Sequence, residues 1–272
     1  MIMDFNAFQN NTLRYMSFDW DNNILHMPTL IHIDTWKDGI WIPKDILPEE
    51  FAKIRKDEGS LWRGRNNDLI LTFEDFRDNG PRGKNAFIED AKWAVINKKF
   101  GPSFHDFINT LINGHIFLII TARGHEPETI KKFVKWLICN YMTQEQREKM
   151  QENLIKFQKL FGSKDSSVKS YLNTCEFIGI MSKYFTNKYG INYELEANVE
   201  DGKERAIDSF LSRLENFAIK VGGKLKFGFS DDDENTVKHM MEFFKEKDLD
   251  VAIDYYIFNT SDKKKERIKL KN

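Results

Sequence analysis

Two short motifs in the first half of the sequence carry groups that suit phosphate chemistry. Asp19 and Asp21 stand two residues apart after an apolar run, so one carboxylate can attack or bind a metal while the other transfers a proton. Thr121, Arg123 and Gly124 follow a second apolar run, where a hydroxyl and turning backbone N–H groups can cradle a phosphate oxygen. Each motif alone is also common in solvated turns.

Two further motifs lie in the second half of the sequence. Asp231 and Asp232 belong to an acidic run that needs a cation or a helix N-terminus to offset its repulsion. Because oxygen ligands without His or Cys favour Mg²⁺ over zinc, this run indicates a magnesium site, with a plain acidic helix cap as the alternative. Lys203 stands near the start of a predicted helix, where a lone lysine is usually solvated.

The motifs fall at the ends of predicted strands or the starts of predicted helices. Apolar runs predict strands at 13–18, 115–120, 177–181, 225–229 and 251–258. Amphipathic helical patterns lie between them, and this alternation predicts an α/β fold with a parallel sheet. Since ligands bind beyond the carboxyl ends of parallel strands, we expect the motifs to meet at one edge of the sheet.

The distance between the first two motifs predicts an insertion. A βαβ unit needs about 30 residues, whereas 100 residues separate Asp21 from Thr121. Residues 30–99 are therefore predicted to form a cap-like insertion, which divides the core into 1–29 and 100–272. A helical elaboration of the core is predicted at about 143–170.

The insertion is rich in tryptophan and arginine. Arg63 and Arg65, beside Trp62, are candidates for binding the substrate, because paired guanidinium hydrogen bonds can hold a second phosphate. The alternative is that the aromatic residues only pack a small core within the insertion. Arg123 and the nearby His125 are further candidates for a substrate contact.

The overall composition narrows the class of protein. The 41 basic and 42 acidic residues give a net charge of −1, which disfavours a globally basic nucleic-acid binder. Two cysteines without metal-ligand spacing indicate a reducing compartment. No apolar run reaches the ~20 residues that span a bilayer. We therefore expect a cytoplasmic protein that does not contact a membrane. For the basic residues 263–271, contact with a nucleic acid is kept as an alternative.

The order Asp-x-Asp, Thr, Lys, Asp-Asp resembles the haloacid dehalogenase (HAD) superfamily of phosphohydrolases. The resemblance covers about 13–27, 115–137 and 175–258, but not the insertion. It implies a HAD-like Rossmannoid three-layer sandwich with strand order 5-4-1-2-3, and it places the insertion near the site as a cap. The activity that it implies is Mg²⁺-dependent hydrolysis of a phosphomonoester through an aspartyl-phosphate.

The resemblance also implies a role for each motif residue. Asp19 corresponds to the nucleophile, and Asp21 to the general acid that later acts as the base. Thr121 corresponds to the hydroxyl that binds the transferring phosphoryl group, and Lys203 to the cation that screens it. Mg²⁺ would be held by the carboxylates of Asp19 and Asp231 and the backbone carbonyl of Asp21, with Asp232 or Asn235 completing the site.

Two departures from the family pattern concern the turns. Asn22 and Asn23 follow Asp21, where Gly-Thr or Gly-Val is usual, and Asn tolerates left-handed backbone. Ser230 replaces the usual glycine before the acidic run.

Two rival functions remain: a phosphatase for nucleotides or nucleic-acid ends, and a non-catalytic phosphate- or protein-binding module. The expected partner is thus a phosphorylated small molecule or nucleotide.

Overall fold

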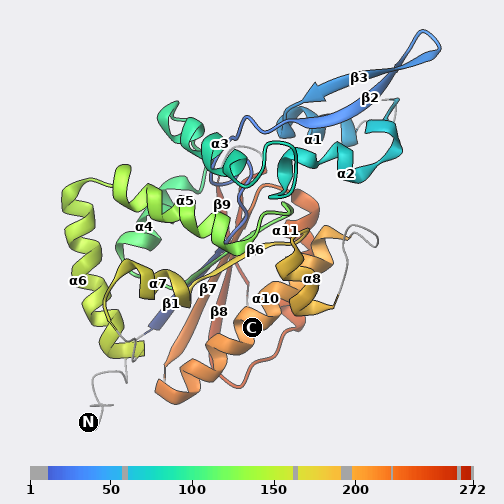
Figure 1. Ribbon diagram of the computed structural model, residues 1–272. Helices are drawn as coiled ribbons and strands as arrows, with labels where there is room; N and C mark the ends of the chain where they lie inside the picture. The colour runs from blue at the N-terminus through green and yellow to red at the C-terminus, as the bar shows by residue number, and fades with distance from the viewer. Residues whose placement is uncertain are drawn as a thin grey trace.

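A mostly parallel sheet forms the centre of the computed structural model, which describes residues 12–56, 61–161, 165–190, 198–221, 223–261 and 265–270. Its six strands lie in the order β6-β5-β1-β7-β8-β9 (Figure 1). The strands are β1 (Thr12–Phe18), β5 (Phe117–Thr121), β6 (Glu176–Gly179), β7 (Lys224–Asp231), β8 (Ile253–Asn259) and β9 (Glu266–Lys269). Read from β8 to β6, the five parallel strands are the fifth, fourth, first, second and third along the chain.

The sixth strand, β9, is not among the strands that the apolar runs predict. It pairs antiparallel with β8 and so closes the edge of the sheet. It lies within the basic stretch 263–271, of which residues 263, 264 and 271 fall outside the described part of the chain.

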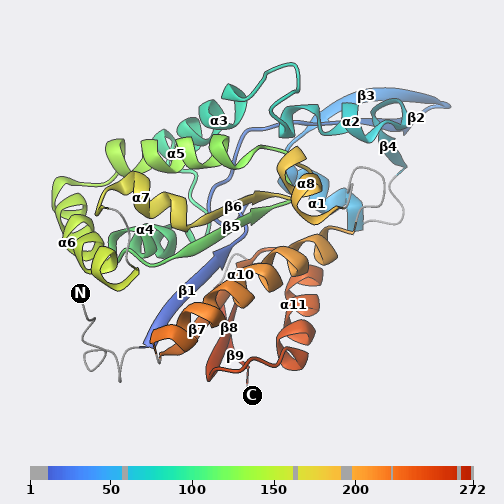
Figure 2. The same cartoon turned by 60° about the horizontal axis from the view of Figure 1, so that its bottom comes forward.

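Helices cover both faces of the sheet, as Figure 2 shows. On one face, α3 (Asn85–Ile96), α4 (Phe104–Ile112) and α5 (Pro127–Asn140) pack on Trp20, whose ring contacts Phe87, Phe107 and Phe133. On the other face, α10 (Val199–Val221) and α11 (Glu234–Glu246) pack on Phe227. The prediction of an α/β fold with a mostly parallel sheet flanked by helices is therefore confirmed.

Three further helices complete the core. They are α6 (Gln144–Phe161), α7 (Val168–Thr174) and α8 (Lys183–Tyr189). The segment predicted as a helical elaboration contains α6, which buries Met150 and Leu154 beside α4. Within the described ranges, no helix is long and apolar enough to cross a membrane.

The predicted insertion contains a second, smaller sheet. Its antiparallel strands lie in the order β3-β2-β4, formed by β2 (Ile31–Lys37), β3 (Ile40–Ile46) and β4 (Trp62–Gly64). Helices α1 (Pro48–Lys56) and α2 (Leu69–Thr72) lie beside it. Buried Ile31, Ile33, Ile46 and Phe76 make a cluster separate from the main core. By contrast, α3, in the last part of the same segment, packs into the main core.

Candidate active site

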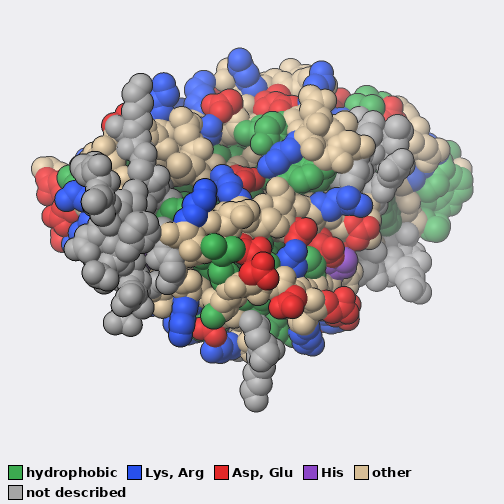
Figure 3. Space-filling view, turned by 90° about the horizontal axis from the view of Figure 1, so that it is seen from below, with side chains coloured by type: hydrophobic (Ala, Val, Ile, Leu, Met, Phe, Trp, Pro, Cys, Tyr) green, Lys and Arg blue, Asp and Glu red, His purple; other side chains and the backbone are tan. Residues whose placement is uncertain are grey.

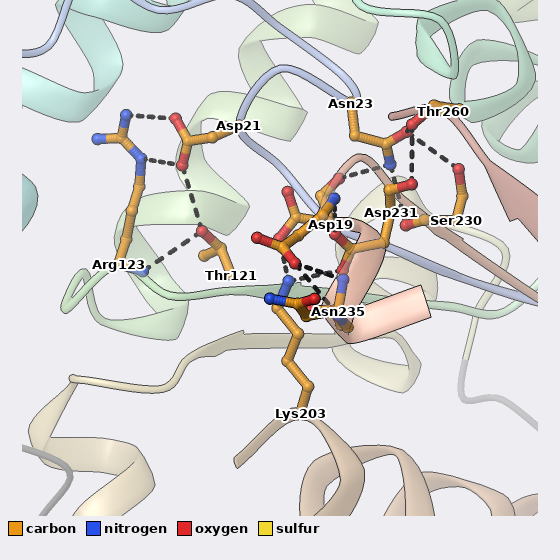
Figure 4. Close-up of polar contacts among 12 residues, drawn as sticks. Asp19, Asp21, Asn23, Thr121, Arg123, Lys203, Ser230, Asp231, Asn235 and Thr260 are labelled. Atoms are coloured by element: carbon orange, nitrogen blue, oxygen red, sulfur yellow. Dashed lines mark hydrogen bonds and ion pairs between the residues drawn. The ribbon is translucent and has the colours of Figure 1, made fainter. Parts of the chain in front are cut away.

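The candidate site lies where β1, β5 and β7 end. Asp19 follows β1 directly, Thr121 is the last residue of β5, and Asp231 is the last residue of β7. Lys203 lies in the first turns of α10, which covers the same edge of the sheet. The backbone N–H of Asp19 donates to the carbonyl of Ser230 at 2.9 Å, so the ends of β1 and β7 are held side by side. Figure 4 shows these groups facing one another.

Lys203 joins two buried carboxylates. Its Nζ donates to Asp19 Oδ1 at 2.8 Å and to Asp231 Oδ2 at 2.6 Å, and all three side chains are buried. Burial alone would lower the pKa of Lys203, but the charges of Asp19 and Asp231 outweigh it and raise that pKa above its usual value. Lys203 is therefore a permanent positive charge inside the site.

One lysine does not balance the carboxylates around it. Ligand oxygens of Asp19, Asp231 and Asp232 all lie within 4.8 Å of one another. Burial raises the pKa of Asp19 well above its ordinary value, even with Lys203 beside it. Burial and then the charge of Asp231 raise the pKa of Asp232 to about 7. Such a cluster of hard oxygens with excess negative charge fits a divalent cation such as Mg²⁺.

A second charged pair holds Asp21. Arg123 donates from Nε and Nη2 to the two carboxylate oxygens of Asp21, at 2.8 and 2.6 Å. The hydroxyl of Thr121 donates to Asp21 Oδ2 at 3.4 Å. The guanidinium is fully buried, and it lies over the ring of Phe76 at 4.3 Å. The forked pair of hydrogen bonds fixes the orientation of the Asp21 carboxylate, which accepts from both residues.

The predicted substrate contact of Arg123 is thus replaced in part by a contact within the protein. Two of its guanidinium nitrogens bind Asp21, and Nη2 also donates to Thr29 Oγ1 at 3.1 Å. The third nitrogen, Nη1, is buried and has no hydrogen-bond partner among the described residues. Arg123 nevertheless lines the cavity of the site.

A buried polar network that sequence reasoning missed supports the floor of the site. Asn23 Nδ2 donates to the carbonyls of Asp19 (3.1 Å) and Ser230 (3.0 Å). Its Oδ1 accepts from the hydroxyls of Ser230 (3.0 Å) and Thr260 (3.1 Å). Asn22, just before it, has φ +57°, the left-handed turn that an asparagine permits. The sequence signals were the unusual Asn-Asn pair after the second aspartate and Ser230 in place of the usual glycine.

The site opens into a cavity of about 220 Å³ between the core and the predicted insertion. Asp19, Asp21, Thr121 and Lys203 line its core side. The insertion is fixed to this loop region, because the N–H of Gly124 donates to the carbonyl of Phe76 at 2.8 Å. Asp78 adds to this, since its Oδ2 accepts from the hydroxyl of Thr129 at 2.7 Å. Residues of the segment 30–99 therefore line part of the cavity.

Arg63 and Arg65 are not brought into this cavity. Arg63 Nε donates to Asp34 Oδ2 at 3.1 Å, and its guanidinium lies over Trp41 at 4.5 Å. Arg65 pairs with Asp34 at 3.3 Å and with Asp45 at 2.8 Å. Because Asp34 is buried, it needs these cations. The structure gives both arginines a place within the insertion, away from the lining of the cavity.

His125 is likewise outside the cavity lining. It is fully buried, with its ring 4.9 Å from that of Phe87, and neither ring nitrogen has a hydrogen-bond partner in the described part of the chain. Burial, and then the charges of Arg123 and Arg77, lower the pKa of His125 well below its usual value. The side chain is therefore a neutral packing group behind Arg123.

The acidic run has a divided role. Asp231 and Asp232 join the cluster at the floor, as predicted. Asp233 instead begins α11, because its Oδ1 accepts from the N–H groups of Asn235 (2.8 Å) and Thr236 (3.2 Å). Asn235 thus takes part in the helix N-cap through its main chain. The helix-cap interpretation is therefore correct for Asp233, and the cation site stays a prediction for Asp231 and Asp232.

Comparisons with protein-family models, with curated proteins and with solved structures found no match for this chain. Its function therefore has to be inferred from the chemistry of the site, because one fold can host many unrelated functions. The chemistry available is a buried carboxylate triad with a lysine, a forked arginine–carboxylate pair and a hydroxyl, all around one cavity.

Proposed function

We propose that the protein is a Mg²⁺-dependent phosphohydrolase of the HAD type, which cleaves a phosphomonoester through an aspartyl-phosphate at Asp19. The observation that carries the proposal is the contact of Lys203 with both Asp19 and Asp231, at 2.8 and 2.6 Å, from three separate parts of the chain. Asp21 and Thr121 line the same cavity. The order of the five parallel strands is also the one that the resemblance implies.

The residues present fit a magnesium ion. Asp19, Asp231 and Asp232 would supply carboxylate oxygens, and the resemblance adds the backbone carbonyl of Asp21. Burial among like charges raises the pKa of Asp19 and of Asp232. A second cation beside Lys203 would lower both pKa values again, because it favours the ionised carboxylates. When bound, Mg²⁺ would neutralise charge on the phosphoryl oxygens as the ester bond stretches.

In the first step, an oxygen of Asp19 attacks phosphorus, and the bond from phosphorus to the ester oxygen breaks. Lys203 holds the attacking carboxylate in place and screens its charge from the phosphate. Thr121 presents its hydroxyl at the end of β5, where a phosphoryl oxygen can accept a hydrogen bond. The leaving oxygen takes a proton from Asp21.

In the second step, Asp21 accepts a proton from water, which attacks phosphorus and releases phosphate and free Asp19. The forked bond from Arg123 orients Asp21 for both steps. Asp21 gives up its proton in the first step and regains one in the second, so it returns to its starting form after each turnover. Arg123 is therefore a positioning residue for Asp21.

The proposal is tested with p-nitrophenyl phosphate, with and without Mg²⁺, in wild type and in Asp19→Asn. We expect hydrolysis that requires Mg²⁺ and that Asp19→Asn abolishes while the fold survives, because the amide cannot attack phosphorus. Asp38→Asn, on the turn between β2 and β3, is the matched control and should keep full activity. Undiminished turnover in Asp19→Asn or in excess EDTA would overturn the proposal.

The non-catalytic alternative makes a different prediction for the same preparations. A binding module would hydrolyse no phosphomonoester at any Mg²⁺ concentration, yet it would bind phosphate through Lys203 and Thr121. Isothermal titration with inorganic phosphate, in parallel with the activity assay, separates the two functions.

A further inference from the structure

The insertion faces the active site with apolar side chains only. Among the described residues, its contributions to the cavity lining are Ile31, Pro48, Phe51, Ala52, Phe73 and Phe76. The two arginines expected there are bound to Asp34 instead. The part of a substrate beyond the phosphate therefore meets hydrocarbon and aromatic surface.

The aromatic rings form a continuous wall. Phe51 and Phe73 pack edge to face with ring centroids 5.7 Å apart, and Phe73 and Phe76 do the same at 5.9 Å. Phe76 lies against the guanidinium of Arg123, so the wall begins at the charged floor. Rings held in this way lose little freedom when they contact a ligand, and a further ring can pack edge to face on them.

The charges of the lining do not suit a second phosphate. Six carboxylates line the cavity: Asp19, Asp21, Glu200, Asp231, Asp232 and Asp233. The cations that line it are Arg123 and Lys203, within the part of the chain that the structure describes. Arg123 is paired with Asp21, and Lys203 with Asp19 and Asp231. Both cations are thus committed to carboxylates of the site, so the described lining offers no separate cation for a second phosphate.

The size of the cavity limits the substrate further. Its volume of about 220 Å³ lies below the range of about 300–1,000 Å³ that is usual for small-molecule pockets. A chain of nucleotides would not fit inside. On the face that Figure 3 shows, acidic and basic side chains are interspersed, so this face offers no continuous basic surface for a nucleic acid.

We infer that the substrate is a monophosphate ester of a compact apolar alcohol, about the size of one aromatic ring, without a second phosphate. The inference rests on the proposed function and adds the substrate class to it. The phosphate would lie at the charged floor, and the apolar group would contact Phe51, Phe73 and Phe76. The rival substrates, nucleotides and nucleic-acid ends, carry the charge that this lining does not balance.

The test compares kcat/KM for esters whose leaving alcohols are of similar acidity. Differences in the intrinsic reactivity of the esters then do not decide which one is hydrolysed fastest. Benzyl phosphate is the apolar ester, and glycerol 1-phosphate is the polar one. The bisphosphate of 1,4-benzenedimethanol has the same ring with a second phosphate, and a short oligonucleotide with a terminal phosphate represents nucleic acid. We expect kcat/KM for benzyl phosphate to exceed each of the others by about tenfold or more, the scale of one well-placed apolar contact.

A substitution in the wall sharpens the comparison. Ala52→Arg places a cation in the lining from α1 and should narrow the preference for benzyl phosphate over the bisphosphate by about tenfold. The matched control is Lys53→Arg, which puts the same group at the next, exposed position of α1 and should leave the preference unchanged. If Ala52→Arg does not fold, the wild-type substrate order decides the inference by itself.

The outcomes separate the inference from the proposed function. A preference for glycerol phosphate, the bisphosphate or the oligonucleotide overturns the inference but leaves a phosphohydrolase. If no ester is hydrolysed, the proposed function fails, and binding of benzylphosphonate against methylphosphonate by calorimetry then tests the wall alone. Equal affinity for the two phosphonates would overturn the inference there too.

Discussion

Lys203 and Arg123 are two buried cations of one cavity, and they hold their carboxylates in opposite ways. Lys203 spreads a compact charge over Asp19 and Asp231, using one oxygen of each. Arg123 commits two nitrogens to both oxygens of a single partner, Asp21. The first arrangement leaves carboxylate oxygens available to a metal or a phosphate, whereas the second fixes one carboxylate in place. The type of cation thus separates the half of the site that we propose to react from the half that we propose to position Asp21.

Removing the shared cation should have the largest effect. Lys203→Met leaves Asp19 and Asp231 buried without a counter-charge, which costs about 3–5 kcal/mol of unfolding free energy, and turnover should be lost. Added Mg²⁺ should restore part of the stability, because it replaces the missing charge. Urea denaturation with and without Mg²⁺ measures this. Unchanged stability without the metal would contradict the contact geometry.

Changing the second cation should slow the reaction without unfolding the protein. Arg123→Lys keeps the charge but loses the fork that orients Asp21, so we expect kcat to fall about 10–100-fold, which is about 1.4–2.8 kcal/mol. Thermal melts serve as the control, and they should move little. A kcat within twofold of wild type would show that the forked geometry has no part in the reaction.

The histidine behind Arg123 predicts a pH effect on stability. The pKa of His125 is lowered in the folded protein, so the unfolded chain binds the proton more tightly below about pH 6.5. The contribution of His125 to the unfolding free energy is therefore largest above that pH. It decreases as the pH falls, by at most about 1.4 kcal/mol per pH unit. His125→Phe keeps the ring contact with Phe87 and should remove this loss.

Urea denaturation of wild type and His125→Phe between pH 5 and 8 checks that expectation. The contributions of the other titrating groups cancel in the difference between the two unfolding free energies. If the unfolding free energies of the two proteins change in parallel across the whole pH range, His125 takes up a proton in the folded state. A role in substrate binding would appear instead as a raised KM in His125→Phe.

The smallest effect on catalysis is expected for Arg63 and Arg65. Replacing both with Ala leaves buried Asp34 without its cations, so about 2–3 kcal/mol of stability should be lost. KM should change less than twofold for every ester, because neither side chain lines the cavity. A tenfold rise in KM for a bisphosphate alone would instead support a role for the two arginines in substrate binding.

Sequence patterns located the strands that carry the site. The run predicted at 13–18 corresponds to β1, Thr12–Phe18, and the run at 225–229 lies within β7, Lys224–Asp231. Apolar runs report burial directly, and the first polar residue after each run marks the edge of the sheet. The pattern of residues alone was therefore enough to predict that Asp19, Thr121 and Asp231 lie close together.

The contacts of the arginines could not be predicted in the same way. Arg123 meets Asp21 across 102 residues, and Arg63 meets Asp34 across 29. Composition shows only that arginines are present, whereas tertiary packing decides with which carboxylate each arginine forms an ion pair. Phe51, Phe73 and Phe76 follow no helical or strand period, so the wall that they form gave no periodic signal.

Asn23 and Ser230 bond to each other across 207 residues, and this separation matters while the chain is being synthesised. β1 pairs on one side with β5 and on the other with β7. The ribosome reaches β7 roughly 100 residues after β5, an interval of roughly 5–20 s at about 5–20 residues per second. Through that interval one edge of the central strand has no partner, a state that invites pairing with other nascent chains. The candidate site is therefore completed late, by the strand that pairs with the open edge of β1.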